Sequence, residues 1–367
     1  MRNISLLIRH RDRYIASLRG LGMRGWFDAV FARTGGDGCS TELRTRMLTP
    51  SLLDTSVLFR LADAERVLVV GAGGGFDLLS GLPIAFALRE RGKTVYLANL
   101  TFTAATRTTA RSVAPDLFAV DAHTEGQSEY FPEKHVATWL ADHGHADTVF
   151  MIRKGGTVSV RAAYEWLARE LDLDSIVLVD GGTDLLMTGD EAGLGTPVED
   201  VTSLLAASAL DLPVKLAVCV GFGVDTFHGV CHAHFLENVA ALAKAGAYHG
   251  VFALTPGIPA VDDWLDVVSW AQRHTPGRES IVCASITDAS CGEFGNHHSL
   301  ARTRADGAEL FINPLMSMVW GFDLDAVAQR VLYRSHIEHA ATPFEVAAAI
   351  EAFRSEVPLR PWRNIPV

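Results

Sequence analysis

The sequence predicts an α/β fold: a doubly wound, mostly parallel, Rossmann-like sheet with helices on both faces. From Arg66 onward, short runs of Val, Ile and Leu alternate with helix-length segments, which is the pattern of a parallel sheet. Most of these runs lack strict polar alternation, as expected for strands buried on both faces. Three runs end in glycine-rich turns that carry aspartates. Open parallel sheets bind ligands at the carboxyl ends of their strands, so these turns predict a small-molecule site.

The elements follow from this alternation. Strands are expected at the apolar runs 67–70, 95–98, 148–152, 176–179, 215–220, 250–254, 281–285 and 309–312. Helices are expected at 77–91, 133–143, 158–171, 198–210, 231–245, 261–273, 323–334 and 343–355. Thr196-Pro197 and Thr342-Pro343 each place a Thr N-cap before a helical Pro, with Glu following, which predicts capping boxes.

The first part of the chain differs from the rest. Residues 1–60 are arginine-rich and have weak helical periodicity, which predicts an N-terminal extension that is mostly helical or irregular. Residues 61–367 are then expected to form a single α/β domain that binds the ligand and carries any catalysis.

Bulk composition limits the classes of function. A net charge of −11 argues against a general nucleic-acid binder, which needs a basic face. No apolar run approaches the roughly 18 residues that span a bilayer. The five cysteines are an odd number without a C-x-x-C pair, which favours a reducing, cytoplasmic setting. The expected partner is a small molecule, and homo-oligomerisation stays open.

A glycine-rich loop, Gly71–Asp77, separates the first strand from the first helix of this domain. A helix N-terminus attracts anions, so the loop predicts a phosphate or carboxylate site; its candidate ligand-binding residues are Gly73, Gly74, Gly75 and Asp77. The loop does not match the dinucleotide-binding fingerprint. Phe76 occupies the position of the third glycine, and Asn99 occupies the end of the second strand, where the fingerprint has an acidic residue. Alternatively, the glycines only permit tight packing and Asp77 caps the helix.

The second glycine-rich turn carries Asp180, Gly181, Gly182, Thr183 and Asp184, followed by Gly189-Asp190-Glu191. Its carboxylates could hold a hard divalent cation through oxygen ligands. They could instead accept hydrogen bonds from sugar hydroxyls or from a cationic group of a substrate. A third interpretation makes Asp180 and Asp184 turn caps and leaves Asp190 and Glu191 solvated.

The third turn leads from Asp225 into a histidine-rich segment. With Asp225, the histidines His228, His232 and His234 resemble a transition-metal set, although Gly229 interrupts the helix that this spacing needs. One of these histidines could instead act as a general acid or base. Taken with the second turn, the metal-ligand candidates are Asp180, Asp184, Asp225, His228 and His232.

The last cluster runs from Thr287 to His298 and continues to Arg302. His297 or His298 could transfer protons, and Arg302 could bind a phosphate or carboxylate with two hydrogen bonds. Cys291 beside a histidine is a weaker candidate nucleophile. The alternative is a long exposed loop with solvated histidines.

The glycine-rich loop Gly71–Asp77 with Gly81-Leu82-Pro83, and the turn Asp180–Asp184 with Gly189-Asp190-Glu191, resemble the uncharacterised family DUF1152. Phe322-Asp323-Leu324-Asp325 adds to the similarity, which would cover roughly residues 60 to 340. The resemblance implies an α/β protein and no established reaction.

Together these features predict an enzyme that acts on a small anionic or sugar-bearing metabolite, nucleotide-like or phosphorylated, by hydrolysis or group transfer. In this hypothesis Asp184, His297 and His298 are catalytic, and the cofactor is unknown, with a divalent metal as the candidate. A non-catalytic small-molecule sensor is the first alternative. An enzyme that uses S-adenosylmethionine or NAD is the second, and Asn99 disfavours it.

Overall fold

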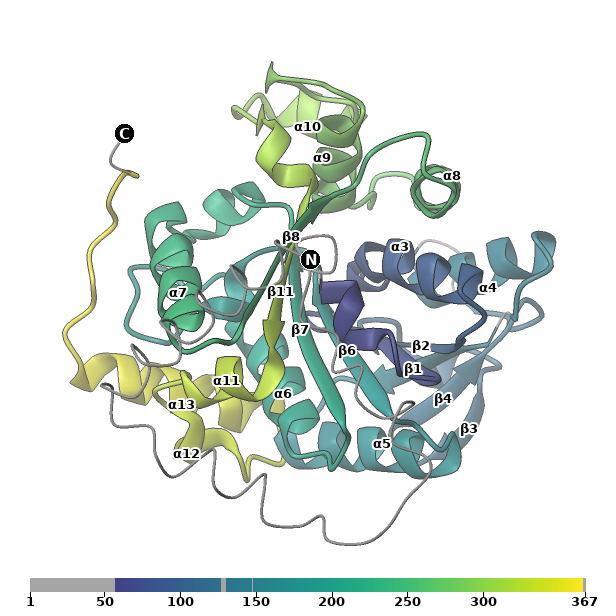
Figure 1. Cartoon of the computed structure of the whole chain (residues 1–367), viewed down its shortest axis with the longest axis horizontal. Coiled ribbons are helices and arrows are strands. Elements are labelled where there is room, and N and C mark those ends of the chain that lie inside the picture. The colour runs from purple at the N-terminus through teal and green to yellow at the C-terminus, as the bar shows by residue number, and fades with distance from the viewer. Residues whose placement is uncertain (1–56, 127–129, 147, 366–367) are drawn as a thin grey trace, which may run out of the picture. The chain divides into compact units, whose positions relative to one another are not determined.

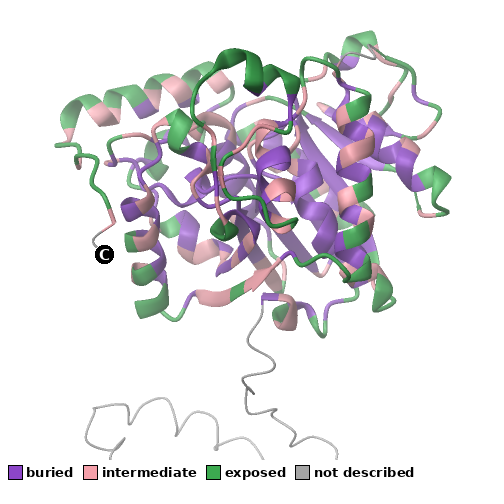
Figure 2. Cartoon of the chain, turned by 90° about the horizontal axis from the view of Figure 1, so that it is seen from above, coloured by how far each residue is buried: buried purple, intermediate pink, exposed green. Residues whose placement is uncertain are grey.

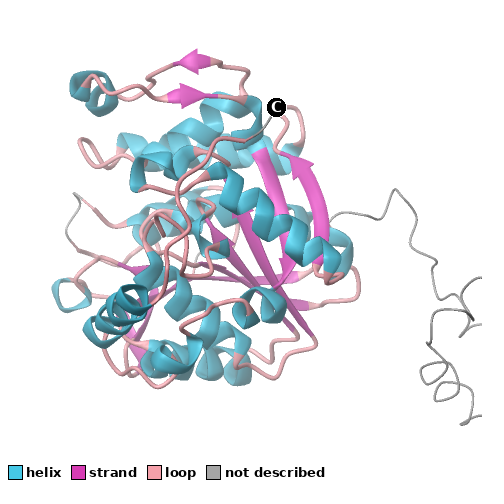
Figure 3. Ribbon diagram, turned by 90° about the vertical axis from the view of Figure 1, so that its left-hand side faces the viewer, coloured by secondary structure: helices cyan, strands magenta, loops and turns pink. Residues whose placement is uncertain are grey.

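The computed structural model of the chain describes residues 57–126, 130–146 and 148–365. Its strands are β1 (Arg66–Gly71), β2 (Thr94–Thr101), β3 (Arg111–Ala114), β4 (Leu117–Val120), β5 (Val149–Arg153), β6 (Ser175–Asp180), β7 (Val214–Val220), β8 (Tyr248–Ala253), β9 (Gly295–Asn296), β10 (Phe311–Ile312) and β11 (Met318–Asp323). Among these residues, β9 and β10 form a small antiparallel pair, and the other strands form one sheet (Figures 1 and 3).

The large sheet has nine strands in the order β3-β4-β5-β2-β1-β6-β7-β11-β8. Its five central strands, β5-β2-β1-β6-β7, run parallel to one another, whereas β4 and β11 are antiparallel to the strands on both sides of them. The prediction of a mostly parallel central sheet is therefore confirmed.

Helices cover both faces of this sheet. They are α3 (Asp77–Glu90), α4 (Pro132–Asp142), α5 (Thr157–Glu170), α6 (Pro197–Ser208), α7 (His232–Lys244), α8 (Pro259–Arg273), α9 (Ile281–Ser290), α10 (Ala301–Asp306), α11 (Leu324–Gln329), α12 (Arg334–Ile337) and α13 (Pro343–Glu356). Short 3-10 helices are η3 (Val57–Leu61), η4 (Ala105–Arg107), η5 (Asp184–Leu186), η6 (Val224–His228) and η7 (Pro314–Ser317).

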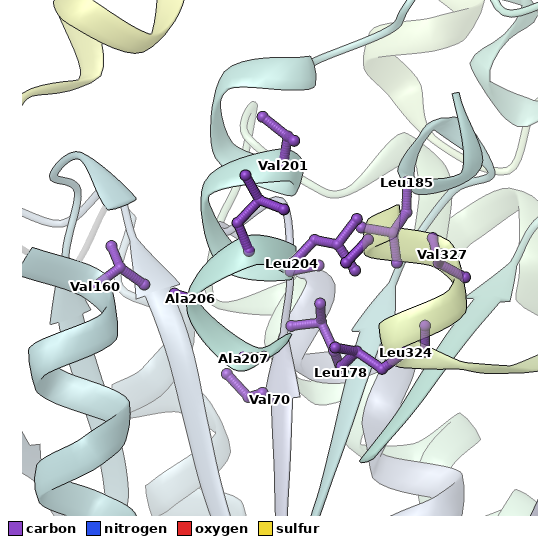
Figure 4. Close-up of a cluster of buried hydrophobic side chains, with 14 of the residues drawn as sticks. Val70, Val160, Leu178, Leu185, Val201, Leu204, Ala206, Ala207, Leu324 and Val327 are labelled. Atoms are coloured by element: carbon purple, nitrogen blue, oxygen red, sulfur yellow. The ribbon is translucent and has the colours of Figure 1, made fainter. Parts of the chain in front are cut away.

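The core consists of two apolar layers, one on each face of the sheet. Leu68 and Val70 of β1 face a layer with α5, α6, α7 and α11, whereas Val67 and Val69 face a layer with α3, α4, α8 and α9. This alternation is what a strand buried on both faces requires. Figure 4 shows part of the first layer, where Leu204 of α6 lies near Leu178 of β6 and the side chains of α11. Figure 2 shows the buried strands inside and the exposed outer surfaces of the helices.

The first six predicted strands are confirmed, and so are the helices except 323–334, where a short α11 is followed by α12. The predicted strand 281–285 is wrong, because these residues begin α9. Ser280 caps that helix by accepting a hydrogen bond from the Cys283 amide at 3.0 Å, and Cys283 and Ile286 are buried at helical spacing. A five-residue apolar run fits either element.

Only the end of the predicted strand 309–312 forms the short β10, and β3, β4 and β11 were not predicted.

Most of the predicted N-terminal extension, residues 1–56, lies outside the described residues, so its structure stays a prediction. Among the helices described, none combines the length and apolar character needed to cross a membrane.

Candidate functional site

Five aspartates from separate segments gather beyond the carboxyl ends of β1, β6 and β7. Asp180 ends β6, Asp184 and Asp225 follow in η5 and η6, and Asp77 and Asp200 lie in the first turns of α3 and α6. We call these five residues the carboxylate cluster. Carboxylate oxygens of Asp77, Asp180 and Asp200 lie within 4.8 Å of one another. The structure therefore brings together Asp77, Asp180, Asp184 and Asp225 as the sequence predicts, and adds Asp200, which the sequence analysis missed.

Glycines provide the space in which these carboxylates meet. A Cβ on Gly73 would lie 2.7 Å from Asp200 Oδ1 and 2.9 Å from Asp77 Oδ2. A Cβ on Gly182 would lie 2.6 Å from Asp225 Oδ2 and 3.0 Å from Asp180 Oδ1. At these distances a side chain at either position would push the carboxylates out of place, so glycine lets them pack against the backbone.

Backbone and hydroxyl groups hold one oxygen of each carboxylate. Oδ2 of Asp77 accepts from the Gly73 amide at 2.7 Å, and Oδ2 of Asp180 from the Leu185 amide at 3.0 Å. Oδ2 of Asp225 accepts from the Thr183 amide at 2.6 Å. These bonds fix the side chains on short loops.

Thr196 bridges two members of the cluster. Its amide donates to Asp184 Oδ2 at 2.7 Å, and its hydroxyl lies 3.0 Å from both Asp184 Oδ2 and Asp200 Oδ2. The predicted capping of α6 by this hydroxyl is wrong, because the side chain turns to the carboxylates instead. The second predicted cap is confirmed: Thr342 accepts from the Glu345 amide at 3.2 Å.

The cluster concentrates negative charge in a buried place. Asp180, Asp184, Asp200 and Asp225 are all buried, and within the described ranges no lysine or arginine forms an ion pair with any of the five. Burial first, and then the neighbouring carboxylates, raise the pKa of Asp180 and Asp200 well above the ordinary value.

The pKa shifts of the other three have the same main cause. Burial raises the pKa of Asp77 to about 7, against the lowering effect of its bond from Gly73. Burial also raises the pKa of Asp225 well above its usual range and that of Asp184 above its ordinary value, while bonds from Thr196 oppose the rise at Asp184. Such a cluster requires protons, a bound cation or a hydrogen-bonding ligand to offset its charge.

The glycine-rich loop itself is mostly occupied by internal hydrogen bonds. The amides of Ala72, Gly73 and Gly75 donate to Val179 O, Asp77 Oδ2 and Leu100 O, at 2.8, 2.7 and 3.1 Å respectively. Gly74 and Gly75 have positive φ angles, and Cβ atoms there would meet Leu100 O and the Tyr130 hydroxyl. A carboxylate of the chain thus takes a position expected for an external anion.

A further buried acid, Glu133, lies outside the carboxylate cluster and is linked to this loop through Asn99. Asn99, at the end of β2, donates from Nδ2 to Gly75 O and to Glu133 Oε1, both at 2.8 Å. Both side chains are fully buried, and burial raises the pKa of Glu133 to about 7, with the Asn99 bond opposing the rise. Asn99 therefore supports the loop internally. The sequence offered no signal for Glu133 beyond an acid in the first turn of a helix.

The Glu133→Gln protein is expected to show a flatter dependence of stability on pH. A carboxyl whose folded pKa is raised from 4.5 to about 7 contributes stability below pH 4.5 that is lost as the pH rises through about 7. Replacing Glu133 should therefore reduce the fall in the free energy of unfolding between these two pH values by at most about 3 kcal/mol. Urea unfolding of both proteins at several pH values measures it, and identical pH profiles would contradict the prediction.

The histidine-rich segment does not assemble a metal site with the cluster. Gly229, with φ of +85°, interrupts the chain between η6 and α7, so His228 and His232 do not share a helix face. His232 Nε2 lies 2.7 Å from the Thr226 hydroxyl, and its ring lies near Phe222. Among the described residues, the group with ligand atoms close enough for a metal is Asp77, Asp180 and Asp200, which includes neither histidine. His228 is exposed, and burial raises the pKa of Asp184 despite a small opposing effect of this neighbouring histidine.

The last cluster forms its own surface network. His297 pairs with Glu293 at 3.3 Å and with Asp288 at 3.8 Å, and Arg302 donates to Glu279 O at 2.7 Å. His298 contacts Asn296 Oδ1 at 3.0 Å. In the part of the chain that the structure describes, no hydrogen bond or ion pair joins these side chains to the carboxylate cluster.

The proton-transfer role of the two histidines and the anion-binding role of Arg302 stay predictions. The Cys291 thiol shows no activation, because burial and two nearby carboxylates raise its pKa.

The interpretation that leaves Glu191 solvated is wrong. This side chain is fully buried and pairs with Arg360 of the C-terminal tail at 2.8 Å, and the same arginine pairs with Asp190. Arg354 of α13 also donates to Gly189 O and Glu191 O. The turn after Asp184 is thus held by the end of the chain.

Comparison with known proteins adds a family but no activity. No curated protein and no solved structure matches the chain. The family model "Protein of unknown function (DUF1152)" matches residues 104–355, which is more than half of the chain. The match includes Asp180, Asp184, Asp200 and Asp225 but not the glycine-rich loop. It begins at residue 104 and ends at residue 355, whereas the predicted resemblance covered roughly residues 60 to 340. The chain therefore belongs to the DUF1152 family.

Proposed function

We propose that the protein is an enzyme that hydrolyses, or transfers a group from, a small anionic or sugar-bearing metabolite at the carboxylate cluster. One observation carries this proposal: five largely buried carboxylates converge beyond the sheet without a paired cation among the described residues. Structural acids are normally paired or solvated, whereas such accumulation of like charge is typical of sites that act on a ligand.

The position of the cluster in the sheet supports the proposal. Counted along the chain, the parallel strands β5-β2-β1-β6-β7 have the order 3-2-1-4-5, an order that supports a Rossmann-like arrangement. The direction of winding changes between β1 and β6, and ligands of such sheets bind at this point. Asp77 follows β1 and Asp180 ends β6, so the cluster lies beside the change of direction.

The chemistry of the cluster favours acid and base roles for carboxyl groups. Asp77, with its pKa near 7, can exchange a proton at neutral pH. Asp184, held by the amide and hydroxyl of Thr196, is a fixed acceptor that can take a proton from a water molecule or a substrate hydroxyl. The remaining carboxylates would bind hydroxyl groups, or a cation that in turn binds the anionic part of the substrate.

The test is a screen of sugar phosphates, nucleosides and nucleotides with Mg²⁺, Mn²⁺ or Ca²⁺, with products followed by mass spectrometry. For a substrate found in this way, Asp184→Asn should lower kcat by about 10²-fold or more, as expected on loss of a general base. Asp211→Asn, which changes an exposed aspartate before β7, is the matched control. Turnover by Asp184→Asn at the wild-type rate would contradict the assignment. Tight binding without product would favour the sensor alternative.

A further inference from the structure

We propose that Asp77, Asp180 and Asp200 form a binding site for one hard divalent cation of the Ca²⁺, Mg²⁺ or Mn²⁺ class. The three carboxylates offer oxygens that all lie within 4.8 Å of one another. Oxygens on opposite sides of a Ca²⁺ ion are about 4.6–5.2 Å apart, given bond lengths of about 2.3–2.6 Å. One ion can therefore reach all three side chains with a small inward movement of the carboxylates, which is larger for Mg²⁺ than for Ca²⁺.

The arrangement of the hydrogen bonds leaves coordinating oxygens available. In Asp180 and Asp200 the bonds from Leu185 and Thr196 reach Oδ2, and the described residues give Oδ1 no hydrogen bond. The Oδ1 atoms of these two residues lie close to Gly182 and Gly73, the glycines that open the space between the loops. Each side chain is thus oriented through one oxygen and can coordinate through the other.

A separate observation points to a ligand at this place. The Ser80 hydroxyl of α3 is 5 % exposed, and among the described residues it forms no hydrogen bond of good geometry. The nearby Cys283 thiol is a weak partner: burial raises the pKa of this thiol, and the hydroxyl opposes the rise. A Cβ on Gly181 would lie 2.8 Å from Ser80 Oγ and 2.8 Å from Asp77 Oδ1, so both oxygens lie against the same glycine beside the other cluster members. A buried hydroxyl without a strong partner is costly, and a water molecule bound to the cation would satisfy it.

The donor set selects the chemical class of the ion. The three ligands are carboxylates, and no cysteine or histidine joins the group among the described residues. Oxygen-only sites favour hard cations over zinc or copper. Asp77 and Gly73 are only partly buried, so solvent reaches the cluster most closely on this side.

This inference deepens the proposed function but can be tested without a substrate. The purified full-length chain, treated with chelator, is titrated with Mn²⁺ while free Mn²⁺ is followed by electron paramagnetic resonance. Ca²⁺ and Mg²⁺ are then added as competitors. We expect one saturable site in the wild type, and a loss of affinity of at least about 10-fold in Asp200→Asn and in Gly73→Ala, whose methyl group would lie against Asp200 Oδ1.

Ser80→Ala is expected to weaken Mn²⁺ binding by a smaller factor, and Asp211→Asn is expected to leave it unchanged. Circular dichroism is the check that each variant is folded. The inference is overturned if the folded wild type binds no Mn²⁺, Ca²⁺ or Mg²⁺ saturably, or if Asp200→Asn binds with unchanged affinity and stoichiometry. If the chelated protein binds no cation but still turns over a substrate, the metal site is overturned and the proposed function stands.

Discussion

Asp180→Asn is expected to make the chelator-treated protein more stable than the wild type, by roughly 1–3 kcal/mol in free energy of unfolding at pH 7.5, because the neutral amide avoids the ionisation that burial and the neighbouring carboxylates disfavour. The negative charges of the four other cluster members all raise the pKa of Asp180, after burial itself. The amide has nearly the same shape, and its oxygen can still accept the bond from the Leu185 amide. Urea unfolding with chelator present measures the difference.

The pH dependence gives the same prediction a second test. Each cluster carboxyl has a raised folded pKa, so its contribution to stability is present at acid pH and is lost as the pH rises; for Asp77 the loss is complete above about 7. The gain in Asp180→Asn should therefore be larger at pH 7.5 than at pH 4.5. Asp211→Asn is the control. A chelated Asp180→Asn protein that is less stable than wild type at neutral pH would show that another group already compensates the cluster.

Arg360→Ala is expected to lower the free energy of unfolding by about 3 kcal/mol, which is the lower end of the range for breaking a buried ion pair. The arginine contacts Asp190, Glu191 and Glu237, and Glu191 is fully buried. The Thr188 and Gly189 amides and Asn238 also donate to Glu191, which moderates the loss when its cation is removed. Urea unfolding of the two proteins measures the cost.

The neighbouring Arg363 provides the control for this experiment. It pairs with Glu237, and both side chains are about half exposed, so Arg363→Ala should cost less than about 1 kcal/mol. The double variant Arg360→Ala, Glu191→Gln should recover part of the loss, because it removes the unpaired buried charge. Equal costs for the two arginine variants would refute a special role for Arg360.

The regular elements were predictable because apolar runs and helix caps are local. The exception at 281–285 arises because five apolar residues fit either element, and the cap at Ser280 decides the outcome. β11 was missed because its segment contains Gly321 and two aromatic residues and pairs antiparallel with β7. Nothing in the local pattern shows that it joins a parallel sheet.

The candidate site was only partly predictable, since its members meet through long-range packing. Asp180, Asp184 and Asp225 follow strand ends and were visible as candidates. Asp200 was hidden in the first turn of α6, where an acid normally complements the helix dipole. Thr196 appeared to be a helix cap, and only the three-dimensional structure shows its hydroxyl between two carboxylates.

The ion pair between Glu191 and Arg360 has a consequence for how the chain matures during synthesis. Arg360 follows every strand of the described sheet along the chain, so it leaves the ribosome after all of them. Until then the turn that follows Asp184 lacks the cation that holds it. We therefore expect the sheet to form first during translation, and the turn after Asp184 to reach its final shape only once Arg360 has emerged.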